Sequence, residues 1–122
     1  MEAKHILIIE DDASVQSLLR EAFEEETFSV QTASDGEEAL RKLEQSIPDI
    51  ILLDIILPKK DGLEVLKDIR KRKPLSHIPV VILTNIEESS RIEQSLSMGA
   101  TTYLVKSNYT LQEIIEKVRA LA

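Results

Sequence analysis

The chain has 122 residues, of which 22 are acidic, 15 are basic and none is cysteine, and its formal net charge is −7. This length is typical of one domain that buries a core without metal or disulfide staples, and the lack of cysteine excludes a disulfide scaffold and a thiol enzyme. The negative charge disfavours nonspecific binding to nucleic acid or anionic lipid. No apolar run approaches the roughly 20 residues of a membrane span. We therefore expect one cytoplasmic domain, residues 1–122, without direct nucleic-acid or membrane contact.

Five short segments predict β-strands. Three of them, near residues 6–9, 50–53 and 79–83, are continuous apolar runs, which favour strands buried on both faces of a parallel sheet. The segment of residues 28–33 alternates between polar and apolar side chains, so it fits at an edge of the sheet. In chain order the predicted strands are His5–Ile9, Phe28–Ala33, Ile50–Leu53, Pro79–Leu83 and Tyr103–Val105.

Between the strands, apolar residues recur with spacings of three and four, which predicts helices at 13–26, 37–44, 63–72, from 89 or 90 to 98, and 110–121. Asp12 or Ser14 is suited to cap the first helix and Asp61 the third, whereas Gly99 closes the fourth as its C-cap. The basic run Arg70–Lys73 fits a solvated helix end, where cations favour the helix dipole, better than a nucleic-acid patch.

Strand and helix alternate five times with short connections, which is the pattern of a parallel sheet covered by helices on both faces. Placing the continuous apolar strands centrally and the alternating second strand at an edge gives the strand order 2-1-3-4-5. We therefore predict an α/β, flavodoxin-like, doubly wound (βα)5 fold. In this order the first and third strands are neighbours at the topological switch point, where ligands bind beyond the carboxyl ends of the strands.

Acidic residues stand at the carboxyl ends of those two strands: Glu10 and Asp11 follow the first, and Asp54 follows the third. We expect the three carboxylates to converge on one crevice. Pairs about 4 Å apart at an effective dielectric near 20 repel by about 4 kcal/mol each, so protonation or a divalent cation has to relieve the charge. An oxygen-rich cluster without thiol or imidazole favours a hard ion such as Mg²⁺.

Lys106 follows the fifth strand and Thr84 ends the fourth, which adds an ammonium group and a hydroxyl to the same edge of the sheet. Carboxylates, Mg²⁺, lysine and hydroxyl are the groups that phosphoryl transfer uses, with Asp54 as the oxygen nucleophile. Taken singly, Lys106 is explained equally well as a surface charge and Thr84 as a strand-end cap. Their combination at separate strand ends favours a phosphoryl-transfer site.

On these residues the sequence resembles, over its whole length, the receiver domain of two-component response regulators. The segment Leu57–Gly62 also resembles the proline-to-Asp-Gly loop that follows the phosphorylated strand in that family. The matching site positions are an acidic pair, a phosphoacceptor, a switch hydroxyl, a switch aromatic and a lysine, which are here Glu10 with Asp11, Asp54, Thr84, Tyr103 and Lys106.

The resemblance implies that Asp54 accepts a phosphoryl group from the phosphohistidine of a sensor histidine kinase or a phosphotransfer protein. It implies a Mg²⁺ site made by Glu10, Asp11, Asp54 and the backbone carbonyl of Ile56. Lys106 would contact the phosphoryl oxygens. A protein of this kind is not an enzyme in the ordinary sense, because it catalyses only its own phosphorylation and dephosphorylation.

The resemblance also implies a switch. Thr84 would move toward the phosphoryl group, and Tyr103 would turn inward into the space that Thr84 leaves. The surface made by the fourth helix, the fifth strand and the fifth helix would change in consequence, and a downstream protein or output domain would respond to it.

Four positions depart from the family pattern. Ser107 replaces the proline that usually follows the lysine on a cis bond, and we expect a trans bond because a non-proline cis bond costs about 3 kcal/mol. Asn85 replaces the usual Ala or Gly after the switch threonine and adds bulk at the mouth of the crevice. Thr101 and Thr102 replace acidic residues common in the subfamily that dimerises to bind DNA, so we expect a monomer or a weak homodimer.

In receivers, the residues two after the phosphoacceptor and two after the switch threonine flank the path of the attacking water. Both are isoleucine here, Ile56 and Ile86. Neither side chain orients a water molecule, so slow self-dephosphorylation is expected.

Two alternative functions fit the sequence less well. A Mg²⁺-dependent phosphohydrolase with Asp54 as nucleophile needs an acid/base partner and a substrate pocket, for which 122 residues leave little room. His5 and His77 lie far from the crevice in the expected topology, so neither is a candidate ligand. A pseudo-receiver that binds partners without phosphorylation is disfavoured by the complete set of site residues.

Overall fold

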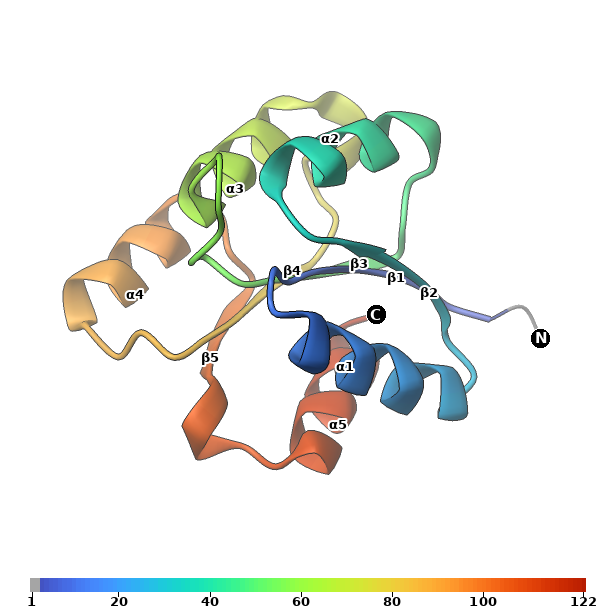
Figure 1. Ribbon diagram of the computed structural model, residues 1–122. Coiled ribbons are helices and arrows are strands. Elements are labelled where there is room, and N and C mark those ends of the chain that lie inside the picture. Colours follow the sequence, from blue (N-terminus) through green and yellow to red (C-terminus); the bar gives the residue numbers. More distant parts are fainter. Residues whose placement is uncertain (1–2) are drawn as a thin grey trace.

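The computed structural model describes residues 3–122 and contains a five-stranded parallel sheet with helices on both sides (Figure 1). Across the sheet the strands are β2 (Ser29–Ala33), β1 (His5–Ile9), β3 (Ile50–Leu53), β4 (Val80–Thr84) and β5 (Thr102–Val105). The predicted α/β fold and its strand order 2-1-3-4-5 are confirmed. The expected domain of residues 1–122 begins with two residues that lie outside the described part.

Helices cover both faces of the sheet, two on one side and three on the other (Figure 1). The pair is α1 (Ala13–Glu25) and α5 (Leu111–Leu121), and the other three are α2 (Gly36–Gln45), α3 (Gly62–Lys71) and α4 (Ser89–Ser97). Two short 3₁₀ helices, η1 (Lys73–Leu75) and η2 (Lys106–Asn108), were not expected from the sequence. In the part of the chain that the structure describes, no helix combines the length and apolar character that crossing a bilayer requires.

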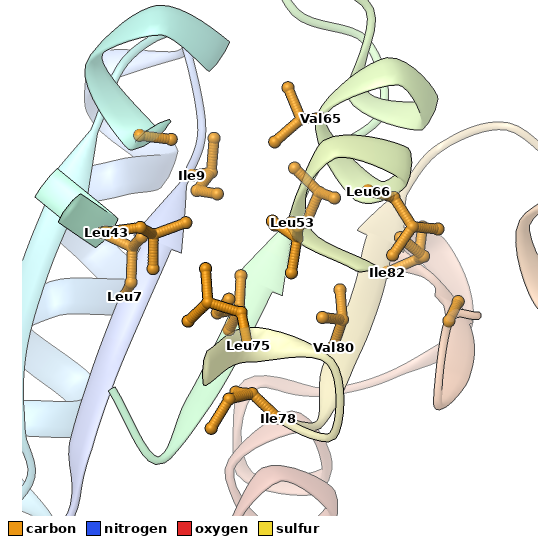
Figure 2. Packing of buried hydrophobic residues seen from close by; sticks show 14 of the residues in the cluster. Leu7, Ile9, Leu43, Leu53, Val65, Leu66, Leu75, Ile78, Val80 and Ile82 are labelled. Carbon is orange, nitrogen blue, oxygen red and sulfur yellow. The ribbon is translucent and has the colours of Figure 1, made fainter. Parts of the chain in front are cut away.

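The alternation of side chains along the strands builds a separate core on each face of the sheet. In β1, Leu7 and Ile9 face α2 and α3, whereas Ile6 and Ile8 face α1 and α5. Figure 2 shows the first of these cores, in which side chains of α2, α3 and η1 pack over those of β1, β3 and β4. Residues of β3 and β4 are buried throughout, as their continuous apolar runs predicted. In β2 only Ala33 is fully buried, which fits its place at the edge.

The predicted N-caps Asp12 and Asp61 are present, whereas Gly99 is not itself the C-cap of the fourth helix. Asp12 Oδ1 accepts hydrogen bonds of 2.9 and 3.1 Å from two N–H groups in the first turn of α1, and Asp61 Oδ1 accepts one of 2.8 Å at the start of α3. At the end of α4, Met98 is the C-cap and Gly99 follows at a φ of 106°. Glycine therefore stands one position after the cap, where a left-handed residue ends the helix.

The expectation that Arg70–Lys73 is a solvated helix end is wrong for Arg70. Its Nε and Nη2 donate hydrogen bonds of 2.9 and 2.7 Å to the carbonyl of Gly99, and its Nη1 donates to the carbonyls of Leu75 (3.1 Å) and Ile78 (2.7 Å). Burial lowers the pKa of the guanidinium. We call this arrangement the Arg70 clamp. It joins α3 to the chain before β4 and to the end of α4, because the fold brings the carbonyls of Leu75, Ile78 and Gly99 to one place.

Candidate functional site

The pairing of β1 with β3 places the acidic residues beside one another. Ile9 and Leu53 are partners in the parallel ladder, so the residues that follow them leave the sheet together. The ladder continues for one residue, since the Asp54 N–H donates to the carbonyl of Ile9 at 3.0 Å. Glu10 is held in the same way toward β2 by a 2.9 Å hydrogen bond from its N–H to the carbonyl of Ala33.

Carboxylate oxygens of Glu10, Asp11 and Asp54 lie within 4.8 Å of one another. The convergence expected from the sequence is therefore confirmed. Glu10 and Asp54 are only 2% and 6% exposed, whereas Asp11 is exposed to solvent. Two buried carboxylates and one exposed carboxylate form a site that is open on one side.

Lys106 bridges the two buried carboxylates. Its Nζ lies 2.6 Å from Glu10 Oε1 and 3.0 Å from Asp54 Oδ2. Burial alone lowers the pKa of Lys106, but the hydrogen bonds to Glu10 and Asp54 outweigh it and raise the pKa above its usual value. Burial raises the pKa of Glu10, and the hydrogen bond from Lys106 offsets only part of that effect. The lysine thus relieves some of the repulsion for which the sequence analysis expected protonation or a divalent cation.

The remaining carboxylate oxygens accept hydrogen bonds from the backbone. Asp54 Oδ1 accepts from the N–H of Ile56 at 3.0 Å, and Glu10 Oε2 accepts from the N–H of Asp12 at 3.2 Å. Each side chain is therefore fixed by its own chain on one oxygen and by Lys106 on the other. The Lys106–Ser107 bond is trans as expected, since no peptide bond in residues 3–122 is cis.

Thr84 lies at the carboxyl end of β4 and is fully buried. Its Oγ1 has no hydrogen-bond partner in the described part of the chain. A buried hydroxyl without a partner costs about 1–3 kcal/mol. Such a group is suited to a ligand oxygen that becomes its acceptor.

Tyr103, in β5, is half-buried, and its hydroxyl donates a 2.8 Å hydrogen bond to the carbonyl of Ile86. Burial raises the pKa of this hydroxyl. Ile86 belongs to the loop between β4 and α4, two residues after Thr84. The aromatic side chain predicted as part of the switch is therefore joined directly to the loop that follows the predicted switch hydroxyl.

Gln16 supports the site from α1, and the sequence analysis missed it. Its Nε2 donates to the carbonyls of Glu10 (2.9 Å) and Ala33 (3.2 Å) and so joins the ends of β1 and β2. A polar residue on an amphipathic helix carries no signal for such a role. Only the fold brings it to the strand ends.

The donor set fits a divalent cation. All three carboxylates offer oxygen ligands, Asp11 faces solvent, and the three acidic side chains expected to bind the metal have come together. Hard ions such as Mg²⁺ prefer such ligands and keep part of their water shell. By contrast, His5 at the start of β1 and His77 before β4 lie toward the opposite ends of the strands, which agrees with the view that neither is a ligand.

Comparison with known proteins identifies the family. A family model described as the response regulator receiver domain matches residues 6–119. The chain belongs to the response regulator receiver domain family. As a receiver domain it is a phosphorylation-controlled signalling switch.

Among characterised proteins, this receiver domain is 40% identical to the alkaline phosphatase synthesis transcriptional regulatory protein PhoP of Bacillus subtilis. The match covers 97% of the chain and 48% of PhoP. The chain spans about half the length of the curated relatives that it matches.

Solved structures of other receiver proteins share the fold. The Mn²⁺-bound form of response regulator Rcp1 is 33% identical with a TM-score of 0.83, covering 96% of this chain and 90% of that one. The BeF3-activated N-terminal receiver domain of Klebsiella pneumoniae RstA is 29% identical with a TM-score of 0.89, covering 96% and 97%.

Proposed function

We propose that Asp54 is the phosphoacceptor of this receiver domain. The observation that carries the proposal is the setting of its carboxylate. Asp54 is buried, accepts a hydrogen bond from Lys106 at 3.0 Å, and lies within 4.8 Å of the carboxylate oxygens of Glu10 and Asp11. These are the groups needed to neutralise a transferring phosphoryl group.

In the proposed reaction, a carboxylate oxygen of Asp54 attacks the phosphorus of a phosphohistidine. The new P–O bond forms as the P–N bond breaks, and the leaving imidazole keeps the electron pair and takes up a proton. Lys106, which already contacts Asp54, would stabilise negative charge on the phosphoryl oxygens. Thr84 would donate its unpartnered hydroxyl to another of these oxygens.

Mg²⁺ is part of the proposal, with Glu10, Asp11, Asp54 and the backbone carbonyl of Ile56 as the groups that would hold it. When bound, the ion supplies positive charge that neutralises the transferring group. The all-oxygen cluster supports this assignment, as does the Mn²⁺-bound form of the related Rcp1. The exposed Asp11 leaves a side of the site open for an ion and its waters.

The proposed switch uses Thr84 and Tyr103. Movement of Thr84 toward a phosphoryl group would pull on the loop whose Ile86 carbonyl binds the Tyr103 hydroxyl. That loop leads into α4, so the surface of α4, β5 and α5 would change. The related RstA receiver, which exists in a BeF3-activated form, supports a switch of this general kind.

The partners proposed for this chain are a sensor histidine kinase or a phosphotransfer protein as donor and a downstream protein or output domain as target. We also propose that the chain is one cytoplasmic domain of residues 1–122. We further propose that it catalyses its own dephosphorylation and that it is a monomer or weak homodimer. No observation favours the phosphohydrolase or the pseudo-receiver as a second function. Sedimentation of the chain with and without a phosphoryl analogue tests its oligomeric state.

Labelling with acetyl phosphate tests the assignment of Asp54. The intact chain should gain the mass of one phosphoryl group when Mg²⁺ is present and little when it is chelated. Asp54→Asn should gain none. Fragmentation of the labelled chain should locate the group on residue 54.

Asp49→Asn is a matched control, because Asp49 precedes the same strand at its other end and accepts a 2.8 Å hydrogen bond from the N–H of His5. Asparagine keeps that acceptor, so this variant should label like the wild type. Equal labelling of Asp54→Asn and the wild type would refute the assignment.

A further inference from the structure

Two Asp-Gly pairs open helices in this chain with the same local design. Asp35 caps α2 and Asp61 caps α3, each through a 2.8 Å hydrogen bond to the first turn. Gly36 and Gly62 are the first residues of these helices, and both are buried. Neither glycine has a positive φ. Among the glycines of the described chain, Gly99 is the one that does. Backbone conformation therefore does not explain why glycine stands at either position.

The surroundings of the two glycines differ. A Cβ on Gly36 would lie 2.6 Å from Val65 Cγ2 and 3.0 Å from Lys60 Cβ, which belong to side chains. A Cβ on Gly62 would lie 2.3 Å from Ile55 Cα and 2.7 Å from the carbonyl oxygen of Asp54, which belong to the backbone. Val65 Cγ2, the nearest atom to Gly36, can move by rotation about χ1, whereas backbone at the end of a central strand yields only by moving the strand end.

The backbone beside Gly62 is the turn that holds Asp54. The N–H of Gly62 donates a 3.0 Å hydrogen bond to the carbonyl of Ile55. One residue on, the N–H of Ile56 donates to Asp54 Oδ1. The first turn of α3 is thus in direct contact with the turn that orients the carboxylate and that presents Asp54 Oδ2 to Lys106.

We infer that Gly62 is a positioning residue for Asp54. Because it has no side chain, α3 packs directly on the Asp54–Ile55 backbone and sets the place of the carboxylate relative to Lys106. This inference rests on the proposed role of Asp54. Ordinary van der Waals contact begins at 3.4 Å, so an added methyl group would displace this backbone by about 1 Å. A misplacement of that size lowers a reaction rate by up to about a hundredfold.

The test compares Gly62→Ala with Gly36→Ala, which adds the same methyl group to the same helix position elsewhere. Leu63→Ala, a core truncation in the first turn of α3, serves as a second control for loss of stability alone. Each purified chain is measured in three ways: the unfolding midpoint, the dissociation constant of Mg²⁺, and the rate of labelling by acetyl phosphate. The backbone amide shifts of Asp54 and Ile56 are recorded by NMR.

All three variants should have lower unfolding midpoints. Only Gly62→Ala should move the amide resonances of Asp54 and Ile56, weaken Mg²⁺ binding, and slow labelling by about tenfold to a hundredfold. The two controls should label within about twofold of the wild type when compared at a temperature where every chain is folded. If Gly62→Ala is not folded in buffer, the assays are repeated in trimethylamine N-oxide, which strengthens burial.

Wild-type amide shifts and Mg²⁺ affinity in a folded Gly62→Ala would overturn the inference, and so would equal effects in Gly36→Ala. A Gly62→Ala chain that stays unfolded in the osmolyte would assign Gly62 to folding alone. Failure of the proposed function looks different, because the wild type itself would then not label, while the amide shifts of the variants would still report on the position of Asp54.

Discussion

The hydroxyl of Tyr103 donates a hydrogen bond to the carbonyl of Ile86, so β5 is joined to the loop that runs from Thr84 into α4. Tyr103→Phe removes this bond and leaves the ring in place. We expect a loss of about 0.5–1.5 kcal/mol in the free energy of unfolding and faster hydrogen exchange in residues 85–88. Tyr109→Phe is the control, because Tyr109 packs against the core on the α1 and α5 side of the sheet, whereas Ile86 packs against the core on the other side. Unchanged exchange in Tyr103→Phe would mean that the loop is held by other contacts.

Removal of the bridging lysine should destabilise the fold in the absence of divalent ions. Lys106→Met leaves the buried carboxylates of Glu10 and Asp54 without their shared cation. We expect a loss of roughly 3 kcal/mol in urea denaturation at neutral pH. Adding Glu10→Gln should recover part of it, because one of the two charges is then gone. A double variant no more stable than Lys106→Met would show that packing of the lysine stem, not charge, accounts for the loss.

Mg²⁺ should bind with a dissociation constant in the millimolar range, because a few carboxylates, a carbonyl and waters make a weak site. Asp11→Ala should abolish this binding in a calorimetric titration. Asp12→Asn is a matched control one residue away, since asparagine still caps α1. Undiminished affinity in Asp11→Ala would place the ion elsewhere.

Asp35 should make a measurable contribution to acid stability. The hydrogen bond that it accepts from the N–H of Glu38 is the main reason why its pKa is lowered. Because the pKa is lower in the folded chain than in the unfolded chain, the carboxylate stabilises the fold at pH values above the unfolded pKa of about 4. This contribution is lost as the pH falls through the folded pKa. Asp35→Ala should cost about 1 kcal/mol at pH 7.

Asp35→Asn separates the charge from the cap. Asparagine keeps the acceptor oxygen, so this variant should be less stable than the wild type at pH 7 and equal to it once Asp35 is protonated in both states. Denaturant midpoints recorded across the acid range check this. A gap between the two proteins that did not close toward low pH would assign the effect to something other than ionisation.

Phosphorylated Asp54 should hydrolyse slowly, because Ile56 and Ile86 do not orient a water molecule. Ile56 is 54% exposed, so Ile56→Asn is tolerated by the fold and should speed phosphate loss by about tenfold, a change of roughly 1.4 kcal/mol in the barrier. Ile86 packs against the core, so Ile86→Glu carries a cost in stability that must be measured beside the rate. An unchanged or slower rate in both variants would contradict this account, and Asn85 would then be the next residue to test.

The backbone of this protein could be predicted because its hydrophobic pattern has few alternative explanations. The continuous apolar runs of β1, β3 and β4 predicted strands buried on both faces, and the alternating pattern of β2 predicted a strand at an edge of the sheet. From the resulting strand order the neighbourhood of Glu10 and Asp54 followed directly. The position of Lys106 at a strand end was predictable on the same grounds.

What the sequence could not supply is the path of individual side chains. Lys106 reaches Glu10 across the width of two strands, and no spacing in the sequence encodes that reach. Arg70 stood within a basic run that is typical of solvated helix ends, and its carbonyl partners come from segments up to 29 residues away. The sequence shows Gly62 only as the end of an Asp-Gly loop, because the backbone that fills the space beside it is brought there by the fold.

The Arg70 clamp holds the C-terminal end of α4 more firmly than its N-terminal end is held. The clamp binds the carbonyl of Gly99 just after the helix, whereas the first turn has no side-chain cap and is joined to α3 by the partly exposed pair Arg91–Asp61 at 3.5 Å. Exposed pairs of this kind are weak, so the end nearest Thr84 yields first. Over nine residues, or about 13 Å of helix, a rotation of roughly 10° about Gly99 carries that end through about 2 Å. Displacement at the protein surface would then be graded along α4, largest beside the phosphoryl site and almost zero at the clamp.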